Sequence, residues 1–456
     1  MKTNKKIVII ATSVILATFL AFATIIEQSV AMTLDSQMTF GGGGGDFAQA
    51  VALWGTKKVI VGYTNSFGAG DLDAFIAIDD GTTLSMYTFG TSKDEQAFAV
   101  TVVGNYAYIV GRIMHDFPPN NNYFDIFVAR WDLLNNQLSG FKAIGQNEVP
   151  LEDGAFAVAA DLNYIFVTGR WRDEKAFLAI LHTPTFNLVL FRELDIGGGI
   201  DIPTAIGFSV VGATYRIIIG GVTTTSTFGD IDAFLARIDF DGVEATKRWA
   251  LRFGTSSPDR VTSIQFVSST TFAVGGTLAN RGFVGYFTVD GGFLKAGATV
   301  FPSAAMTSTI TSISWNGTHL AAAGYFYYNP ARLEDVYILL IDRNGLLVDA
   351  KGYGGEQNDR AHGVALDNKV TVVGVTNTLP NVVFTPPFTY REVQVVPHGA
   401  PIPLTPPFMF FADISGPFSV STTTFNENTL FPPFSLQTPT FNSPVNGDVF
   451  IVRFTT

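Results

Sequence analysis

Five acidic residues stand at equivalent places in a repeated sequence pattern, each just before a stretch of small and apolar residues: Asp46, Glu95, Asp153, Asp259 and Asp359. Carboxylates gathered around one opening would attract cations. Carboxylates beside Gly-rich segments also accept hydrogen bonds from their own loop. We favour the hydrogen-bonding role, because these acids recur with the pattern and a binding site normally breaks a repeat. Two units have Pro203 and Ser308 in place of the acid.

Other chemically capable residues lack the spacing that their chemistry needs. Paired acids at 71–73, 230–232 and 239–241 hint at calcium, without the ligand count of a dedicated loop. The five histidines show no metal-binding spacing, and the chain has no cysteine and no nucleophile elbow. We therefore assign no catalytic residue, no cofactor and no confident metal site, and keep calcium as an alternative.

One sequence motif marks a modification site. Asn316, Gly317 and Thr318 form an N-glycosylation sequon. The motif falls in a predicted turn, on the side opposite a long insertion described below. We name Asn316 as the glycosylation candidate.

Composition and the first residues bear on location and partners. Acids outnumber Lys and Arg by 39 to 28, and an acidic surface repels nucleic acid. A basic start, an uncharged apolar run at 7–26 and small residues at 29–31 predict an export signal cleaved after Ala31. The run is also long enough for an uncleaved membrane anchor. We expect a secreted or cell-surface protein, held together without disulfides.

The elements that carry these residues repeat along the chain. Each unit closes on a large apolar residue, at Phe40, Phe89, Ile144, Ile196, Phe253, Phe301 and Tyr353. A small residue recurs in the first strand of each unit, at Ala50, Ala99, Ala157, Gly207, Ser263, Ser312 and Gly363. The second strand ends in glycine, at Gly62, Gly111, Gly169, Gly221, Gly276, Gly324 and Gly374. This pattern predicts an all-β, seven-bladed β-propeller with four-stranded blades, spanning residues 32–456.

The seventh unit lacks a fourth strand, because the chain stops just after its third. Residues 33–40 match the fourth-strand pattern of residues 84–90. We therefore expect the N-terminal strand to lie beside residues 449–454 and to complete the last blade. Such a closure leaves no blade half-built.

A Pro- and Phe-rich insertion, residues 377–447, separates the second and third strands of the last unit. It holds 13 of the 21 prolines in the chain. Proline cannot donate to a strand ladder, so the insertion is not a further blade. One interpretation is a packed lid or a small β excursion, sealing the central opening. The other is a partner-binding surface of exposed Phe side chains.

The units resemble the SBBP-type β-propeller repeats of exported proteins. The likeness rests on residues 62–70, on Asp73 to Phe75 and on Tyr353 to Gly355 with Asp359. It implies a seven-bladed propeller at or beyond the cell surface and no established catalytic chemistry. Lys175 and Gly282 depart from the acid expected at the start of the third strand.

Two functions fit this sequence. The first is a non-catalytic binding or structural propeller that engages a protein or a cell-envelope polymer through the face bearing the insertion. The second is an extracellular polysaccharide-active enzyme, a hydrolase or lyase, with carboxylates on the same face. So many acids recur as turn and cap residues that no catalytic pair stands out. We favour the binding propeller.

Overall fold

The computed structural model describes residues 31–117, 121–145, 152–172, 175–196, 199–224, 231–303, 306–328, 333–377, 382–395, 408–413, 419–422, 426–428, 435–437 and 447–456. Every regular element within them is a β-strand. No helix in these ranges is long and apolar enough to cross a membrane. The predicted export signal or anchor, at residues 1–31, lies outside the described ranges except for Ala31.

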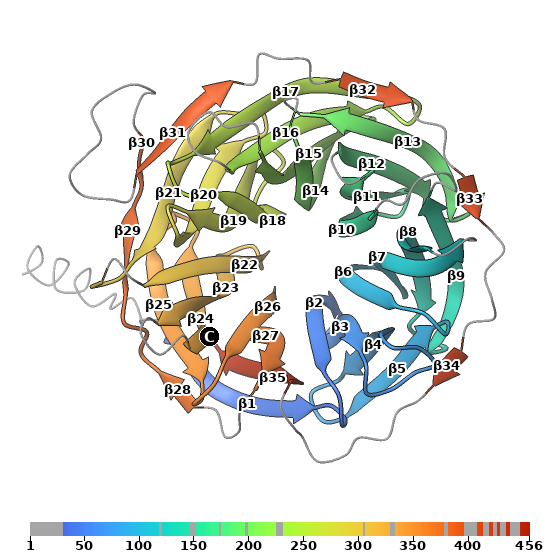
Figure 1. Cartoon of the computed structure of the whole chain (residues 1–456). Coiled ribbons are helices and arrows are strands. Elements are labelled where there is room, and N and C mark those ends of the chain that lie inside the picture. The colour runs from blue at the N-terminus through green and yellow to red at the C-terminus, as the bar shows by residue number, and fades with distance from the viewer. Residues whose placement is uncertain are drawn as a thin grey trace, which may run out of the picture.

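Seven antiparallel sheets stand around a central axis, which confirms the predicted propeller (Figure 1). Blades 1 to 3 contain, from the axis outward, β2 (Asp46–Trp54), β3 (Lys57–Thr64), β4 (Asp73–Asp79) and β5 (Leu84–Gly90); β6 (Glu95–Val103), β7 (Tyr106–Phe117), β8 (Asn121–Asp132) and β9 (Gln137–Gly145); β10 (Gly154–Ala160), β11 (Tyr164–Trp171), β12 (Lys175–His182) and β13 (Asn187–Asp195).

The remaining blades continue in chain order. Blades 4 to 6 contain β14 (Asp201–Val211), β15 (Thr214–Thr223), β16 (Asp232–Phe240) and β17 (Ala245–Gly254); β18 (Arg260–Phe266), β19 (Thr271–Leu278), β20 (Arg281–Thr288) and β21 (Phe293–Val300); β22 (Thr307–Trp315), β23 (His319–Tyr328), β24 (Leu333–Asp342) and β25 (Leu347–Gly354). Blade 7 contains β26 (Asp359–Leu366), β27 (Lys369–Thr376), β35 (Asp448–Thr455) and β1 (Thr33–Phe40).

The N-terminal strand closes the ring as predicted. β1 runs antiparallel to β35, from Thr33 opposite Thr455 to Phe40 opposite Val449. The other side of β35 pairs with β27. Phe40 is buried and packs edge-on against Phe75 of blade 1. The two ends of the propeller therefore complete one blade together.

The core is divided among the interfaces between blades. Seven apolar clusters occur, and each joins residues of two neighbouring blades. All seven residues predicted to close the units are buried. Since a twisted four-stranded sheet is apolar on both faces here, each blade contributes to two clusters. The hydrophobic effect therefore stabilises every interface between neighbouring blades around the ring.

A bulge at one place in every first strand explains the repeated glycine. The register shifts between the residues equivalent to Ala48 and Ala50 in all seven blades. The glycine near the end of the second strand lies opposite this bulge. A Cβ on any of the seven would lie closer than 3.0 Å to a backbone oxygen of the first strand. Only glycine fits this position without movement of the backbone.

The bulge also corrects the predicted alignment of blade 4. Its register shift lies between Pro203 and Ala205, so Ala205, rather than Gly207, corresponds to Ala50. Sequence similarity alone placed this blade two residues too far along the chain. The same shift moves the position expected to carry the acid from Pro203 to Asp201.

Short strands of the insertion run around the outside of the ring (Figure 1). They add a fifth strand to blades 6, 5, 4, 3, 2 and 1 in that order: β28 (Val382–Phe384), β29 (Thr389–Glu392), β31 (Phe408–Asp413), β32 (Ser419–Thr422), β33 (Asn426–Asn428) and β34 (Ser435–Gln437). β30 (Gln394–Val395) pairs in parallel with β31. We call these seven strands the belt. These described strands follow the outer rim of the ring.

The belt is fitted to the blades through aromatic side chains and glycine. Phe384 lies over Gly352 of β25, and Tyr390 lies over Gly297 of β21. Phe388 packs against Phe301 and Tyr337. The described belt strands contain no proline, as strand ladders require donors that proline lacks.

The bulge glycine gives the first testable prediction. Gly324→Ala should lower the free energy of unfolding by at least about 2 kcal/mol, because the new Cβ overlaps the Thr309 carbonyl oxygen. Gly43→Ala is the matched control, since nothing lies within 4 Å of its Cβ position. Denaturant unfolding of both variants measures the difference. Equal stability of the two would contradict the steric role of this glycine.

Candidate functional site

The five predicted carboxylates lie on one face of the ring, but they do not point into solvent. Asp46, Glu95, Asp153, Asp259 and Asp359 are all buried. We call this face, where the second strand of each blade connects to the third, the insertion face. The acids accept hydrogen bonds from nearby loops. Gly42 N donates to Asp46 at 2.8 Å, and Thr91 N donates to Glu95 at 2.9 Å.

Two further blades complete this set. Asp201 of blade 4 occupies the equivalent position, is fully buried and accepts a hydrogen bond from Ile196 N at 2.8 Å. Sequence reasoning missed it, because the bulge that sets its register was not visible. In blade 6 the position holds Ser308, which binds Gly282 N at 2.8 Å and Thr299 Oγ1 at 2.7 Å.

Four of these acids meet a second acid across a blade interface. The partner stands at the start of the third strand of the preceding blade. A glycine that ends the outer strand separates the two carboxylates and leaves no room for a Cβ between them. The pairs, with their glycine, are Asp73 and Glu95 at Gly90, Asp232 and Asp259 at Gly254, Asp335 and Asp359 at Gly354, and Asp448 and Asp46 at Gly41.

Burial makes several of these carboxyls weak acids. Burial, with a smaller contribution from the neighbouring acid, raises the pKa of Glu95 to about 8, of Asp259 to about 7 and of Asp335 to about 6. Burial also raises the pKa of Asp73. Its Oδ1 is buried and has no hydrogen-bond partner among the described residues. With a pKa of about 8, the Glu95 carboxyl retains its proton at neutral pH.

The calcium alternative gains no support from the geometry. Within the described ranges no three His, Asp or Glu side chains are grouped closely enough to hold a metal ion. Asp73 donates nothing and accepts from Gly70 N at 2.9 Å, which matches a loop-capping role. The buried pairs provide two acids each, fewer than the six to eight oxygen ligands that calcium usually takes.

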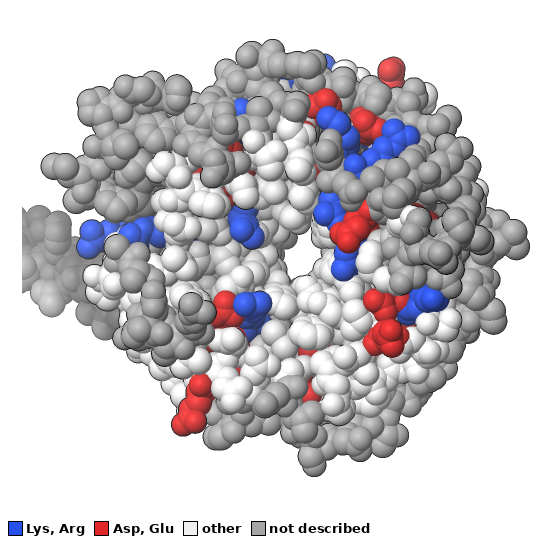
Figure 2. All heavy atoms as spheres, viewed as in Figure 1, with Lys and Arg blue, Asp and Glu red and all other residues white. Residues whose placement is uncertain are grey.

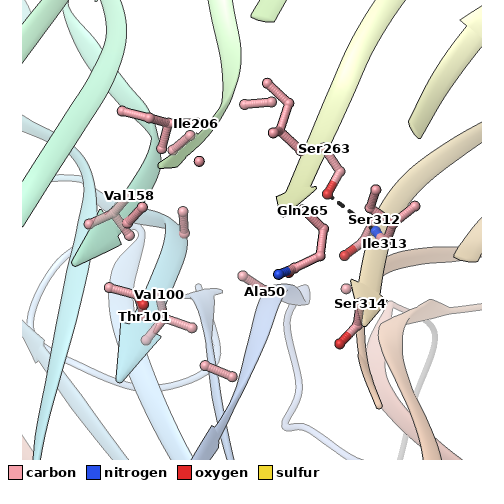
Figure 3. Close-up of a pocket in the computed structure, with 18 of the residues that line it drawn as sticks. Ala50, Val100, Thr101, Val158, Ile206, Ser263, Gln265, Ser312, Ile313 and Ser314 are labelled. Carbon is pink, nitrogen blue, oxygen red and sulfur yellow. Dashed lines mark hydrogen bonds between the residues drawn. The ribbon is translucent and has the colours of Figure 1, made fainter. Parts of the chain in front are cut away.

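A central channel of about 510 Å³ opens between the seven innermost strands. None of its lining residues is Asp, Glu, Lys or Arg. Figure 3 shows that its two walls differ: Val100, Val158 and Ile206 make one side mostly apolar, with Thr101 beside Val100. The opposite side, from blades 5 and 6, carries polar groups at Ser263, Gln265, Ser312 and Ser314.

The residues at the rim of the channel on the insertion face differ from blade to blade. In each blade the rim comprises one residue of the first strand, just before the bulge, and the residue paired with it in the second strand. We call these fourteen residues the rim pairs: Phe47 and Tyr63, Gln96 and Arg112, Gly154 and Arg170, Ile202 and Val222, Arg260 and Thr277, Thr309 and Tyr325, Arg360 and Val375. The scaffold residues beside them repeat, whereas these residues do not.

Aromatic rings are concentrated over blades 1 to 3. Phe47 stacks on Tyr63 with ring centres 5.0 Å apart, and Tyr63 meets Phe98 edge-on at 6.3 Å. Phe98 lies 5.5 Å from Phe156, and both line the channel. The Arg112 guanidinium lies 4.0 Å from the centre of the Phe124 ring and 5.7 Å from that of Phe98. These residues form a continuous, half-buried aromatic row.

The glycosylation candidate lies on the opposite face of the ring. Asn316 is exposed in the turn between β22 and β23. Its Oδ1 accepts hydrogen bonds from Thr318 N and His319 N, and its Nδ2 donates to Asp367 O at 2.9 Å. The side-chain amide is therefore accessible and already engaged within the turn.

Comparisons with known proteins find solved propeller structures of low sequence identity. No protein-family model matches it, and no curated protein matches it. The β-propeller domain of the Trilobed protease from Pyrococcus furiosus is 10% identical, with a TM-score of 0.40, over 76% of this chain and 98% of that one. The Dos1 propeller is 12% identical, with a TM-score of 0.43, over 79% and 95%. We draw no functional argument from likenesses at this level.

A third solved structure is a larger protein. The acylaminoacyl peptidase of Pyrococcus horikoshii is 9% identical, with a TM-score of 0.39. The match covers 76% of this chain and 50% of the peptidase. The seven-bladed architecture therefore rests on the strand pairings of this chain itself.

The buried carboxyls predict an unusual dependence of stability on pH. Because the pKa of Glu95 is raised in the folded protein, from 4.5 to about 8, its stabilising proton is fully present below pH 4.5 and is lost as pH rises through 8. The melting temperature should therefore fall between pH 5 and pH 9. Glu95→Gln keeps an acceptor without a charge, so its melting temperature should exceed that of the natural protein at pH 9 by at least about 2 °C.

The control for this prediction is Asp80→Asn. Asp80 is exposed and its pKa is lowered by hydrogen bonds from Thr82 and Thr83, so its removal should leave the slope between pH 5 and pH 9 unchanged. Thermal unfolding across this range measures both variants. A Glu95→Gln curve that stays parallel to that of the natural protein would refute the role of burial at this site.

Proposed function

We propose that this chain is an exported, non-catalytic propeller of the SBBP repeat type, which binds its ligand at the rim of the central channel on the insertion face. The observation that carries the proposal is the loss of repeat symmetry at the rim pairs. Acids, bulges, glycines and apolar clusters recur around the ring because they hold blades together. The rim pairs have no such constraint and differ in every blade, as residues selected for a ligand do.

The alternative, an extracellular polysaccharide-active enzyme, fits the geometry less well. Hydrolysis of a glycosidic bond needs two carboxyl groups that face the substrate. The recurring acids are buried beneath the rim. Two other acids near the rim, Glu152 and Glu334, form ion pairs with Arg170 and Arg360. These contacts favour a surface that holds a ligand over one that transforms it.

Export and surface location are supported by sequence rather than by geometry. The basic start, the apolar run and the small residues at 29–31 suit an export signal, and an absence of cysteine suits a fold that relies on burial alone. A protein or a cell-envelope polymer outside the cell is then the partner class within reach of the rim.

Rim variants test this function. The probes are arrays of immobilised polysaccharides and of extended peptides, read with the protein lacking residues 1–31. Phe98→Ala with Phe156→Ala removes two rings of the row and should weaken binding at least tenfold, a cost of about 1.4 kcal/mol. Val243→Ala is the control, since Val243 is 82% exposed in a turn on the opposite face.

Two results would overturn the proposal. One is release of new reducing ends from any bound polysaccharide, which would show catalysis. The other is that the rim variant binds every probe as tightly as the natural protein does, while the two proteins have the same melting temperature. The expected result is rim-dependent binding without turnover.

A further inference from the structure

The charges of the rim differ from those of the whole chain. Four of the seven rim pairs contain an arginine, at Arg112, Arg170, Arg260 and Arg360, and none contains Asp, Glu or Lys. The chain as a whole carries an excess of acids, with a net charge of −11. On the face drawn in Figure 2, Lys and Arg side chains lie beside the central opening, with Asp and Glu side chains next to several of them. A local cationic rim on an acidic protein favours an anionic ligand at this one place.

Hydrogen bonds fix most of the rim arginines, and two of them already pair with an acid, Arg170 with Glu152 and Arg360 with Glu334. Arg112 Nε donates to Gln96 Oε1 at 2.9 Å, and Arg170 Nε donates to the Glu152 carbonyl oxygen at 2.9 Å. These contacts orient guanidinium groups that would otherwise be mobile. Arg260 is exposed, and no carboxylate in the described ranges forms an ion pair with it. Guanidinium groups bind carboxylates through two parallel hydrogen bonds.

The aromatic row gives the ligand a second property. Phe47, Tyr63, Phe98 and Phe156 are half-buried rings that follow one another along one side of the same rim. A ring face carries partial negative charge, so it attracts the C–H face of a sugar ring while excluding water. Successive rings suit successive sugar units better than they suit a single small anion. An extended saccharide would then place its acidic groups beside the arginines.

This inference rests on the proposed function. We propose that the rim binds a linear polysaccharide whose sugar units carry carboxylate groups. Sugar rings pack on the aromatic row of blades 1 to 3, and carboxylates pair with the rim arginines. Single-stranded nucleic acid also combines stacking with negative charge. Poly(dT) is therefore the competing ligand in the experiment.

The experiment compares each acidic polymer with its neutral form. The probes are polygalacturonate, alginate and hyaluronate, each beside the same polymer with its carboxylates esterified, and poly(dT). Affinity is measured by biolayer interferometry with the protein lacking residues 1–31. The natural protein should bind at least one acidic polymer, at least tenfold more weakly after esterification, with an affinity that falls as salt rises.

Two matched variants test the arginines. Arg260→Gln should weaken binding of the acidic polymer by roughly threefold to fivefold. Arg343→Gln removes the same charge from an exposed turn on the opposite face and should leave binding unchanged. Both side chains are exposed, so neither change removes a packed group.

The failures of the two proposals are distinguishable. Equal binding of the acidic and esterified polymers, or preference for poly(dT), would overturn the carboxylate inference and leave rim binding intact. The carboxylate inference would also be overturned, with rim binding left intact, if the protein bound none of the three acidic polymers but bound a peptide or a neutral glycan through the rim. Equal effects of Arg260→Gln and Arg343→Gln would also overturn it.

Discussion

The antiparallel pairing of β1 with β35 is the contact on which the ring depends. Without β1, blade 7 would have three strands, and Phe40 would be lost from the apolar cluster between blades 7 and 1. The joint is reinforced by Lys369, which binds Asp35 at 2.8 Å, and by Arg453, which binds Ser36 at 2.9 Å. Since every blade shares an apolar cluster with each neighbour, opening one interface weakens a circle of contacts rather than one sheet.

The belt and the buried acid pairs both lie at the ends of the outer strands. Belt strands pair with the last three or four residues of the outer strands, and these include Gly90, Gly254 and Gly354. The same glycines separate the carboxyl pairs. The belt therefore pairs with the same ends of the outer strands that separate the carboxyl pairs. Blade 7 differs, because its outer strand is the N-terminal strand β1 and no described belt strand pairs with it.

Local patterns predicted the scaffold and not the site. The seven closing residues, the seven glycines and the role of residues 33–40 could be read from the sequence, because each recurs with a steric or packing cause. Asp201 was missed because a bulge changes the register without changing the composition. A small β excursion was one interpretation of the insertion, but the blades with which its strands pair could not be read from the sequence, because the strands are short and pair with edges that exist only after the blades form. The rim arginines carry no repeat signal, so they became visible only once the strand register aligned the blades.

A disulfide across the closing strands tests the account most directly. Thr33 and Thr455 are opposite each other, with hydroxyl oxygens 2.5 Å apart, and the chain has no cysteine of its own. Thiol titration of the Thr33→Cys and Thr455→Cys double variant after mild oxidation measures whether these ends meet. Closure predicts that both thiols disappear within a monomer and that unfolding becomes harder by about 2 to 4 kcal/mol. Two thiols that remain free in a folded monomer would contradict it.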